Sequence, residues 1–316
     1  MRSMKPIRLE AIYVPYKNRC SNLVDLLQLL SFFDGPIYLM ISKDSTHPLL
    51  PDSLSTNARM LYVEENFHAF FANLRTSNHR CTIADSSKWD LPLKRSFAIT
   101  HAVAHGYEKM LFIDDDIRPE SASELAIGAT CLEQWTIAGC FVDEFIDTSV
   151  FGHLKRVAGE EVHPFLSGSF LFVKPANTVG FFPCIYNEDW LFMLPQVLNA
   201  SICSFGSVAQ IPFDPFNDVK RPGFQEFGDI VAEGLYSLAA SNAYDCRFDL
   251  QFWRRAILER QELFGELARS LTSIAHQRII AAALAANRSI SPEDCHRFVF
   301  DWEQDQVTWR DYMSNL

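Results

Sequence analysis

The stretch Lys109-Met110-Leu111-Phe112-Ile113-Asp114-Asp115-Asp116-Ile117-Arg118-Pro119 decides the fold prediction for this chain of 316 residues. Residues 109–113 form a short apolar run of the kind found in strands buried on both faces of a parallel sheet. Three aspartates follow that run directly. The sequence therefore predicts that they lie at the carboxyl end of a buried strand, where open α/β sheets bind their ligands.

Strand and helix patterns alternate on both sides of this stretch. Further strands are predicted at 7–14, 36–41, 60–63 and 136–142, and an apolar, aromatic run covers 165–173. Helical spacing of apolar residues is found at 22–33, 93–106, 121–130, 189–198 and 224–240. This alternation predicts an α/β fold with a mostly parallel, mixed sheet flanked by helices, Rossmann-like in type.

The pattern changes after about residue 244. Residues 248–269 and 271–286 are amphipathic, and Ser291-Pro292-Glu293-Asp294 has the cap, proline and first-turn acids of a helix start. We therefore expect a main domain at 1–243 and a helical C-terminal extension at 244–316. The extension could cover part of a ligand site or form the contact of a homodimer.

Composition excludes several classes of function. The net charge is −11 and the pI about 5.3, and no basic cluster exceeds a pair, so nucleic acid and anionic membranes are disfavoured as partners. No apolar run reaches the ~20 residues of a membrane span, and no secretory leader pattern is visible. The eight cysteines contain no C-x-x-C pair, which favours free thiols in a cytoplasmic protein.

Three adjacent carboxylates repel one another, and each raises the pKa of its neighbours. A divalent cation removes this cost, and Mg²⁺ or Mn²⁺ prefers such hard oxygen ligands and bridges them to phosphates. The alternative interpretation of Asp114-Asp115-Asp116 is a solvated acidic turn whose aspartates cap backbone groups.

The order of motifs resembles a known family. Lys94-Arg95-Ser96 at a helix start, Gly106-Tyr107 at its end, and the strand with its three aspartates resemble the core of GT-A-fold glycosyltransferases of the family-2-like kind. The resemblance covers residues 7–240. It implies a metal-dependent enzyme that transfers a sugar from a nucleoside-diphosphate sugar to a hydroxyl acceptor, with Mn²⁺ or Mg²⁺ as cofactor.

The resemblance also implies roles for individual residues. The donor would contact residues at the ends of the first two strands, the helix start, the aspartate cluster and a small-residue segment: Pro15, Tyr16, Asn18, Asp44, Arg95, Asp114, Asp115 and Gly168. The metal would be bound by Asp114 and Asp116. In Asn187-Glu188-Asp189-Trp190, Asp189 or, as second choice, Glu188 would be the catalytic base, although both also suit a helix start.

The chain departs from the family in one respect. Many relatives supply a late histidine or aspartate to the metal, and here no histidine lies between His163 and His276. Asp214, Asp218 or Asp229 could replace it, or water and phosphate could complete the site. Trp190, Phe213 and Phe216 could stack on a sugar, but packing in the core is the commoner role of an aromatic residue.

Three other functions compete with this one. A haloacid-dehalogenase-like phosphatase also places two aspartates after a strand, but its motif has Thr or Val where this chain has Arg118. A sugar-nucleotide nucleotidyltransferase needs a glycine-rich loop after the first strand, and residues 14–19 contain no glycine. A non-catalytic protein that binds nucleotide sugars is the third.

Overall fold

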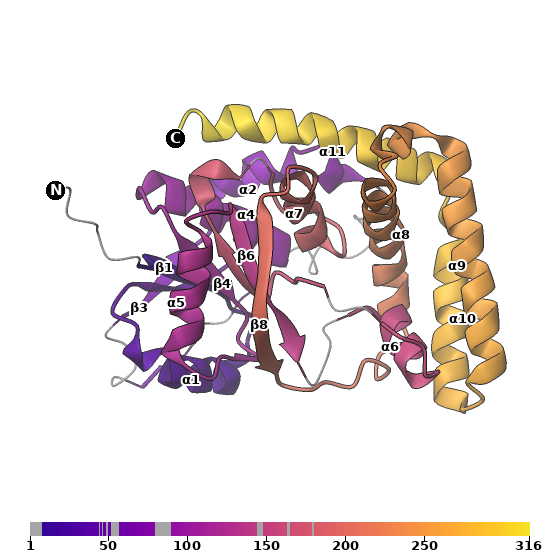
Figure 1. The fold of residues 1–316 in the computed structure, drawn as a ribbon, viewed down its shortest axis with the longest axis horizontal. Coiled ribbons are helices and arrows are strands. Elements are labelled where there is room, and N and C mark those ends of the chain that lie inside the picture. The colour runs from indigo at the N-terminus through magenta and orange to yellow at the C-terminus, as the bar shows by residue number, and fades with distance from the viewer. Residues whose placement is uncertain are drawn as a thin grey trace.

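An eight-stranded mixed sheet forms the centre of the computed structural model, with strand order β3-β2-β1-β4-β7-β6-β8-β5 (Figure 1). The structure describes residues 8–43, 45, 47–48, 50–51, 57–79, 90–143, 148–162, 165–178 and 180–316. The strands are β1 (Ala11–Pro15), β2 (Ile37–Ile41), β3 (Ala58–Tyr62), β4 (Met110–Ile113), β5 (Ile117–Arg118), β6 (Ile137–Asp143), β7 (Phe170–Val173) and β8 (Ile202–Gln210).

Four neighbouring strands, β3, β2, β1 and β4, run parallel. Strand β7 is antiparallel to both β4 and β6, while β8 is parallel to β6 and antiparallel to β5. The predicted α/β class and the mixed, mostly parallel sheet are confirmed.

Helices cover both faces of the sheet. The α-helices are α1 (Cys20–Leu29), α2 (Glu65–Ala72), α4 (Asp90–Ala104), α5 (Ala122–Cys131), α6 (Val150–Val157), α7 (Glu188–Leu198), α8 (Arg221–Ala240), α9 (Leu250–Ser270), α10 (Ile274–Arg288) and α11 (Pro292–Met313). Short 3₁₀ turns are η1 (Leu30–Phe32), η3 (Thr76–Asn78), η5 (Pro175–Asn177) and η6 (Tyr244–Phe248).

Alternation along β1 divides the core into two layers, because successive strand residues point to opposite faces. Ala11 and Tyr13 pack in the cluster shared with α2, α4, α7, α8 and α11. Ile12 and Val14 pack in the cluster shared with α1 and α5. The end of β1 is therefore held firmly from both sides.

The C-terminal helices lie at one end and across the top of the molecule in the view of Figure 1. The predicted start of α11 is confirmed, because Ser291 and Asp294 form a reciprocal capping box. Trp302 and Trp309 of α11 belong to the same core cluster as Tyr13 of β1. The domain boundary between residues 243 and 244 stays a prediction. Within the described residues, no helix combines the length and apolarity that crossing a bilayer requires.

The sequence patterns missed four elements: β5, β8, α2 and α6. Strand β8 is nine residues long, but most of its side chains are only partly buried or exposed, and Gly206 has a positive φ of 55°. It therefore carries no continuous apolar run. Conversely, only Phe170–Val173 of the apolar run at 165–173 is a strand. Residues 167–169 instead enter the site described next.

Candidate functional site

Two parallel strands bring the site together. Strands β1 and β4 are neighbours, with Ala11 opposite Met110 and Tyr13 opposite Phe112. The chain leaves both strands at the same edge of the sheet, so the segment after β1 and the three aspartates after β4 meet there. The predicted position of the aspartates at the end of a buried strand is confirmed.

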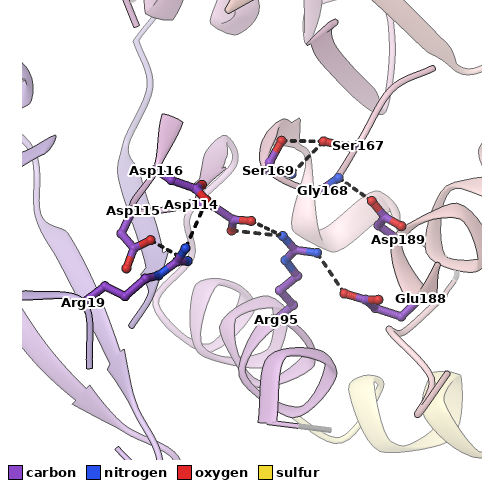
Figure 2. Close-up of polar contacts among 10 residues, drawn as sticks. All are labelled: Arg19, Arg95, Asp114, Asp115, Asp116, Ser167, Gly168, Ser169, Glu188 and Asp189. Carbon is purple, nitrogen blue, oxygen red and sulfur yellow. Dashed lines mark hydrogen bonds and ion pairs between the residues drawn. The ribbon is translucent and has the colours of Figure 1, made fainter. Parts of the chain in front are cut away.

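Arg19, which follows β1, is the first cation at this edge. Its Nη2 lies 2.6 Å from Oδ1 of Asp115, and its Nη1 donates to Oδ2 of Asp116 at 3.1 Å (Figure 2). The Asp115 side chain is fully buried, whereas that of Arg19 is 52% exposed. Burial raises the pKa of Asp115 to about 7, although Arg19 acts in the opposite direction. Arg19 thus supplies the countercharge that this carboxylate needs.

Arg95 of α4 is the second cation. Its Nη2 donates to Oδ1 and Oδ2 of Asp114 at 3.0 and 3.1 Å, and its Nη1 donates to Oε1 of Glu188 at 2.9 Å (Figure 2). Its side chain is only 3% exposed. Burial raises the pKa of Asp114 and of Glu188, and Arg95 opposes both shifts. Arg95 therefore joins the aspartate cluster to the first turn of α7.

Gly168 and Asp189 lie beside Arg95. The amide of Gly168 donates to Oδ2 of Asp189 at 2.6 Å, and the amide of Trp190 donates to Oδ1 at 2.9 Å. A Cβ atom at Gly168 would lie 2.5 Å from Nη1 of Arg95 and 3.0 Å from Cβ of Asp189. Glycine is required here because the backbone passes so close to these side chains. Both oxygens of Asp189 are hydrogen bonded in this state.

A cavity of about 540 Å³ opens on the aspartates. Its lining includes Asp114 and Asp116, the cations Arg19 and Arg221, and the aromatic ring of Phe213. The guanidinium of Arg221 lies 4.7 Å from the centre of the Phe213 ring. The cavity therefore presents carboxylates on one side and two arginines near them, which suits an anionic ligand that carries a divalent cation.

Three of the residues that were predicted to contact the nucleotide donor lie at or just after the end of β1. Pro15 is its last residue, Tyr16 is buried, and its carbonyl accepts from Nζ of Lys94 at 2.6 Å. Asn18 has a left-handed backbone, with φ of 60°. Asp44 lies outside the described residues, so its role stays a prediction.

The aspartate carboxylates differ in how many of their oxygens already have hydrogen-bond partners. Oδ1 of Asp116 is buried without a hydrogen-bond partner, whereas both oxygens of Asp114 accept from Arg95. Among the described residues, no three His, Cys, Asp or Glu side chains gather as a metal site of their own. This donor set fits an ion such as Mg²⁺, which is commonly held by one or two carboxylates and the phosphates of its substrate.

The residues proposed to complete the metal site have other partners. Oδ1 of Asp214 accepts from the amide of Phe216, and Oδ1 of Asp218 accepts from that of Lys220, each at 2.9 Å. Asp229 is buried in α8 and accepts from the side chain of Asn187. Water and phosphate are therefore the better candidates for the remaining ligands.

Of the three aromatic residues that were predicted to stack on a sugar, one lines the cavity and two pack against other aromatic rings. Phe213 lines the cavity. Trp190 packs edge-on against Phe165 at 4.5 Å, and Phe216 packs against His276 at 5.0 Å. Only Phe213 is placed where it could contact a ligand in the cavity.

Sequence reasoning assigned no role here to Arg19 or Arg221. Arg19 could have been found, because it directly follows Asn18, to which the resemblance assigns a contact with the donor. Arg221 comes from the far side of the cavity, at the first residue of α8. No local pattern in its sequence indicates that position.

Comparison with known proteins gives a distant likeness. No protein-family model matches the chain, and no curated protein matches it. Solved structures that resemble it include the mannosyltransferase PcManGT from Pyrobaculum calidifontis in complex with GDP-Man and Mn²⁺, with 11% identity, a TM-score of 0.43, and 96% of this chain and 89% of that chain covered.

Two further structures resemble it at similar distances. Mannosyl-3-phosphoglycerate synthase from Rubrobacter xylanophilus has 9% identity and a TM-score of 0.32 over 77% of this chain and 75% of that chain. The protein A197 from STIV has 13% identity and a TM-score of 0.35 over 64% of this chain and 83% of that chain. At these values the likeness carries no information about the substrate of this chain.

Proposed function

We propose that this chain is a metal-dependent glycosyltransferase that transfers a sugar from a nucleoside-diphosphate sugar to a hydroxyl acceptor in the cavity at the end of β4. The observation that carries the proposal is the joining of Asp114 to Glu188 through Arg95, beside a cavity that Asp116, Arg19 and Arg221 also line. Two carboxylates and two arginines therefore line one ligand-sized space, and Arg95 connects one of those carboxylates, Asp114, to the candidate base Glu188.

The diphosphate of the donor is the group that this cavity suits. Asp116, with its unpartnered Oδ1, and Asp114 would hold Mn²⁺ or Mg²⁺. The bound ion supplies Lewis-acid stabilisation of charge on the departing phosphate. Arg19 and Arg221 would bind phosphate oxygens directly, because guanidinium groups form bidentate contacts with phosphate.

The acceptor side depends on the first turn of α7. A base within hydrogen-bond reach of the acceptor hydroxyl contributes about 10²–10⁴ in rate. Asp189 and Glu188 are the candidates, and Asp189 lies between the amide of Gly168 and its own helix. Because both oxygens of Asp189 already accept hydrogen bonds, the carboxylate would be held in one orientation until an acceptor hydroxyl approaches.

A phosphatase of the haloacid-dehalogenase type suits the site less well. Such an enzyme needs the first aspartate after the strand as a nucleophile with an accessible oxygen. Pairing with Arg95 lowers the nucleophilicity of both oxygens of Asp114 but leaves lone pairs for a cation, and the position two residues after Asp116 is Arg118. Release of inorganic phosphate from sugar phosphates would nevertheless decide for it.

The test is a binding and turnover screen on the full chain. Thermal unfolding is followed with uridine, guanosine, adenosine, cytidine and thymidine diphosphates, each with and without Mn²⁺, and nucleotide release is then measured with the matching sugar donors. We expect one base to raise the unfolding temperature only with Mn²⁺, and its donors to be turned over. Stabilisation without turnover of any donor would instead indicate a non-catalytic binding protein.

Two variants complete the design. Asp116→Asn removes a ligand charge with little change of shape and should abolish the Mn²⁺-dependent stabilisation. Asp311→Asn makes the same change on the exposed surface of α11 and should behave as the unaltered chain. If no nucleoside diphosphate stabilises the chain with Mn²⁺, the proposed function is wrong.

A further inference from the structure

A buried cluster of charges lies behind the first turn of α7, outside the cavity that the proposed function uses. Arg260 of α9 is 4% exposed, and Glu226 and Asp229 of α8 are 1% exposed each. Nη2 of Arg260 lies 3.0 Å from Glu233 and 3.6 Å from Asp229, and Nε lies 3.9 Å from Glu226. One buried cation thus serves three carboxylates.

A hydrogen bond between two described residues connects this cluster to the site. Oδ1 of Asp229 accepts from Nδ2 of Asn187 at 2.9 Å. Asn187 is the N-cap residue of α7, directly before Glu188, yet its side chain makes no capping bond to its own helix. The side-chain NH2 group of Asn187 donates to α8, and its side-chain oxygen does not accept from the first turn of α7, as the oxygen of an N-cap residue normally does.

The backbone at this position also requires support. Asn187 has a left-handed conformation, with φ of 62° and ψ of 35°, which costs most residues with a side chain about 1 kcal/mol or more and costs asparagine less. A Cβ atom at Gly228 would lie 2.2 Å from the carbonyl oxygen of Tyr186. Helix α8 therefore lies directly against the turn that leads into Glu188 and Asp189.

Arg260 is held in place from a third helix. Its guanidinium carbon lies 3.7 Å from the centre of the Phe151 ring of α6, so the planar group stacks on an aromatic face. A carboxylate that is this deeply buried can ionise only beside a countercharge. With Arg260 absent, Asp229 would lose its nearest described cation and its bond to Asn187 would weaken.

We propose that Arg260 is a positioning residue, which acts on Glu188 and Asp189 through Asp229 and the left-handed turn at Asn187. It makes no contact with the cavity at the aspartates. In this arrangement α9 of the C-terminal extension sets the geometry of the candidate base. The catalytic part of this inference rests on the proposed function, whereas the structural part does not.

The test measures the turn itself as well as turnover. Hydrogen exchange at residues 186–194 is followed by mass spectrometry in the full chain and in Arg260→Met, Arg260→Lys, Asn187→Ala and the double variant Arg260→Met/Asn187→Ala. We expect exchange in this segment about tenfold faster in Arg260→Met and in Asn187→Ala. The double variant should be no faster than the faster single variant, because both act through one contact.

Turnover gives the second readout. In Arg260→Met and Asn187→Ala, kcat should fall by about 10- to 100-fold with an unchanged donor KM, and Arg260→Lys should recover part of the loss. Arg254→Met, on the exposed side of α9, is the matched control and should change neither readout. Should Arg260→Met not fold, Arg260→Lys and Asn187→Ala decide the question.

Two results would overturn the inference. The first is a rate of hydrogen exchange at residues 186–194 that does not change in Arg260→Met. If Arg260→Met does not fold, the same result in both Arg260→Lys and Asn187→Ala would overturn the inference. The other is strictly additive effects in the double variant, which would show that Arg260 stabilises the protein without acting through Asn187. Absence of any turnover in the unaltered chain would refute the proposed function alone, because the exchange result would still decide whether Arg260 positions the turn.

Discussion

Nη2 of Arg95 donates to both carboxylate oxygens of Asp114, at 3.0 and 3.1 Å. The second terminal nitrogen of the same guanidinium donates to Glu188. A single buried arginine therefore fixes the distance between the proposed donor side and the proposed acceptor side of the site.

Two replacements of Arg95 should distinguish the effect of its positive charge from the effect of its planar shape. Arg95→Lys keeps the charge but cannot reach both acids with a planar group, so we expect turnover to fall at least about 100-fold. Arg95→Met leaves the buried Glu188 and the partly buried Asp114 without this countercharge and should cost about 3 kcal/mol of unfolding free energy. Urea unfolding and nucleotide release measure the two effects, with Arg288→Lys on the exposed face of α10 as control.

Arg19 and a divalent cation should compete for Asp116. Because Nη1 of Arg19 bonds to Oδ2 of Asp116, Arg19→Gln should raise the affinity for free Mn²⁺. The same change should lower the affinity for the nucleoside diphosphate with Mn²⁺ by about tenfold, since a phosphate contact is lost. Calorimetric titrations of Mn²⁺ without nucleotide, and of the nucleoside diphosphate with Mn²⁺, test whether the two affinities change in opposite directions. An equal change in both titrations would contradict the role of Arg19.

A methyl group at position 168 should displace the side chain of Arg95 or the backbone beside it. In Gly168→Ala, the added carbon would lie 2.5 Å from Nη1 of Arg95, so the guanidinium or the backbone must move. We expect a loss of about 1–3 kcal/mol in unfolding free energy and a larger relative loss of kcat than of donor affinity. Gly265→Ala in α9 meets only Arg269 at 3.8 Å and should stabilise the chain by up to about 1 kcal/mol.

Stability should fall as the pH rises from about 6.5 to 8. Burial raises the pKa of Glu226 to about 8 and that of Asp229 to about 7, although Arg260 opposes both shifts. The folded state therefore binds these protons more tightly than the unfolded state, and the advantage is lost as they dissociate. The slope should be about 1.4 kcal/mol per pH unit for each acid that keeps its proton in the folded state while it is ionised in the unfolded chain, and it should flatten above the folded pKa of that acid.

The lower limit of this window is set by two histidines. Burial lowers the pKa of His101 and of His153 to about 4. Below the pKa of an unfolded histidine, the unfolded chain therefore binds protons that the folded state does not, and the free energy of unfolding falls as the pH falls. Thermal unfolding of the unaltered chain and of Glu226→Gln across pH 6.5–8 provides the test. The slope should be shallower in the variant, and an equal slope would show that Glu226 is ionised throughout.

Local pattern predicted the α/β class and the central strands because their apolar runs must be buried wherever the chain goes. The same holds for the aspartate cluster, since Met110–Ile113 is buried on both faces and the acids follow it without a break. It failed for β8, whose half-exposed side chains leave no apolar run. It also gave no signal for α6, which packs chiefly against the C-terminal helices.

The sequence by itself determined that three aspartates follow a buried strand. An apolar run is stable when its side chains are buried, and the charged residues that follow it must lie where water or counterions can reach them. The tertiary structure alone decided which cations neutralise them. Arg19 and Arg95 are 96 and 20 residues before Asp115, and Arg260 acts from a helix near the other end of the chain. Electrostatic attraction depends on distance in space, and only the folded sheet and its helices set those distances.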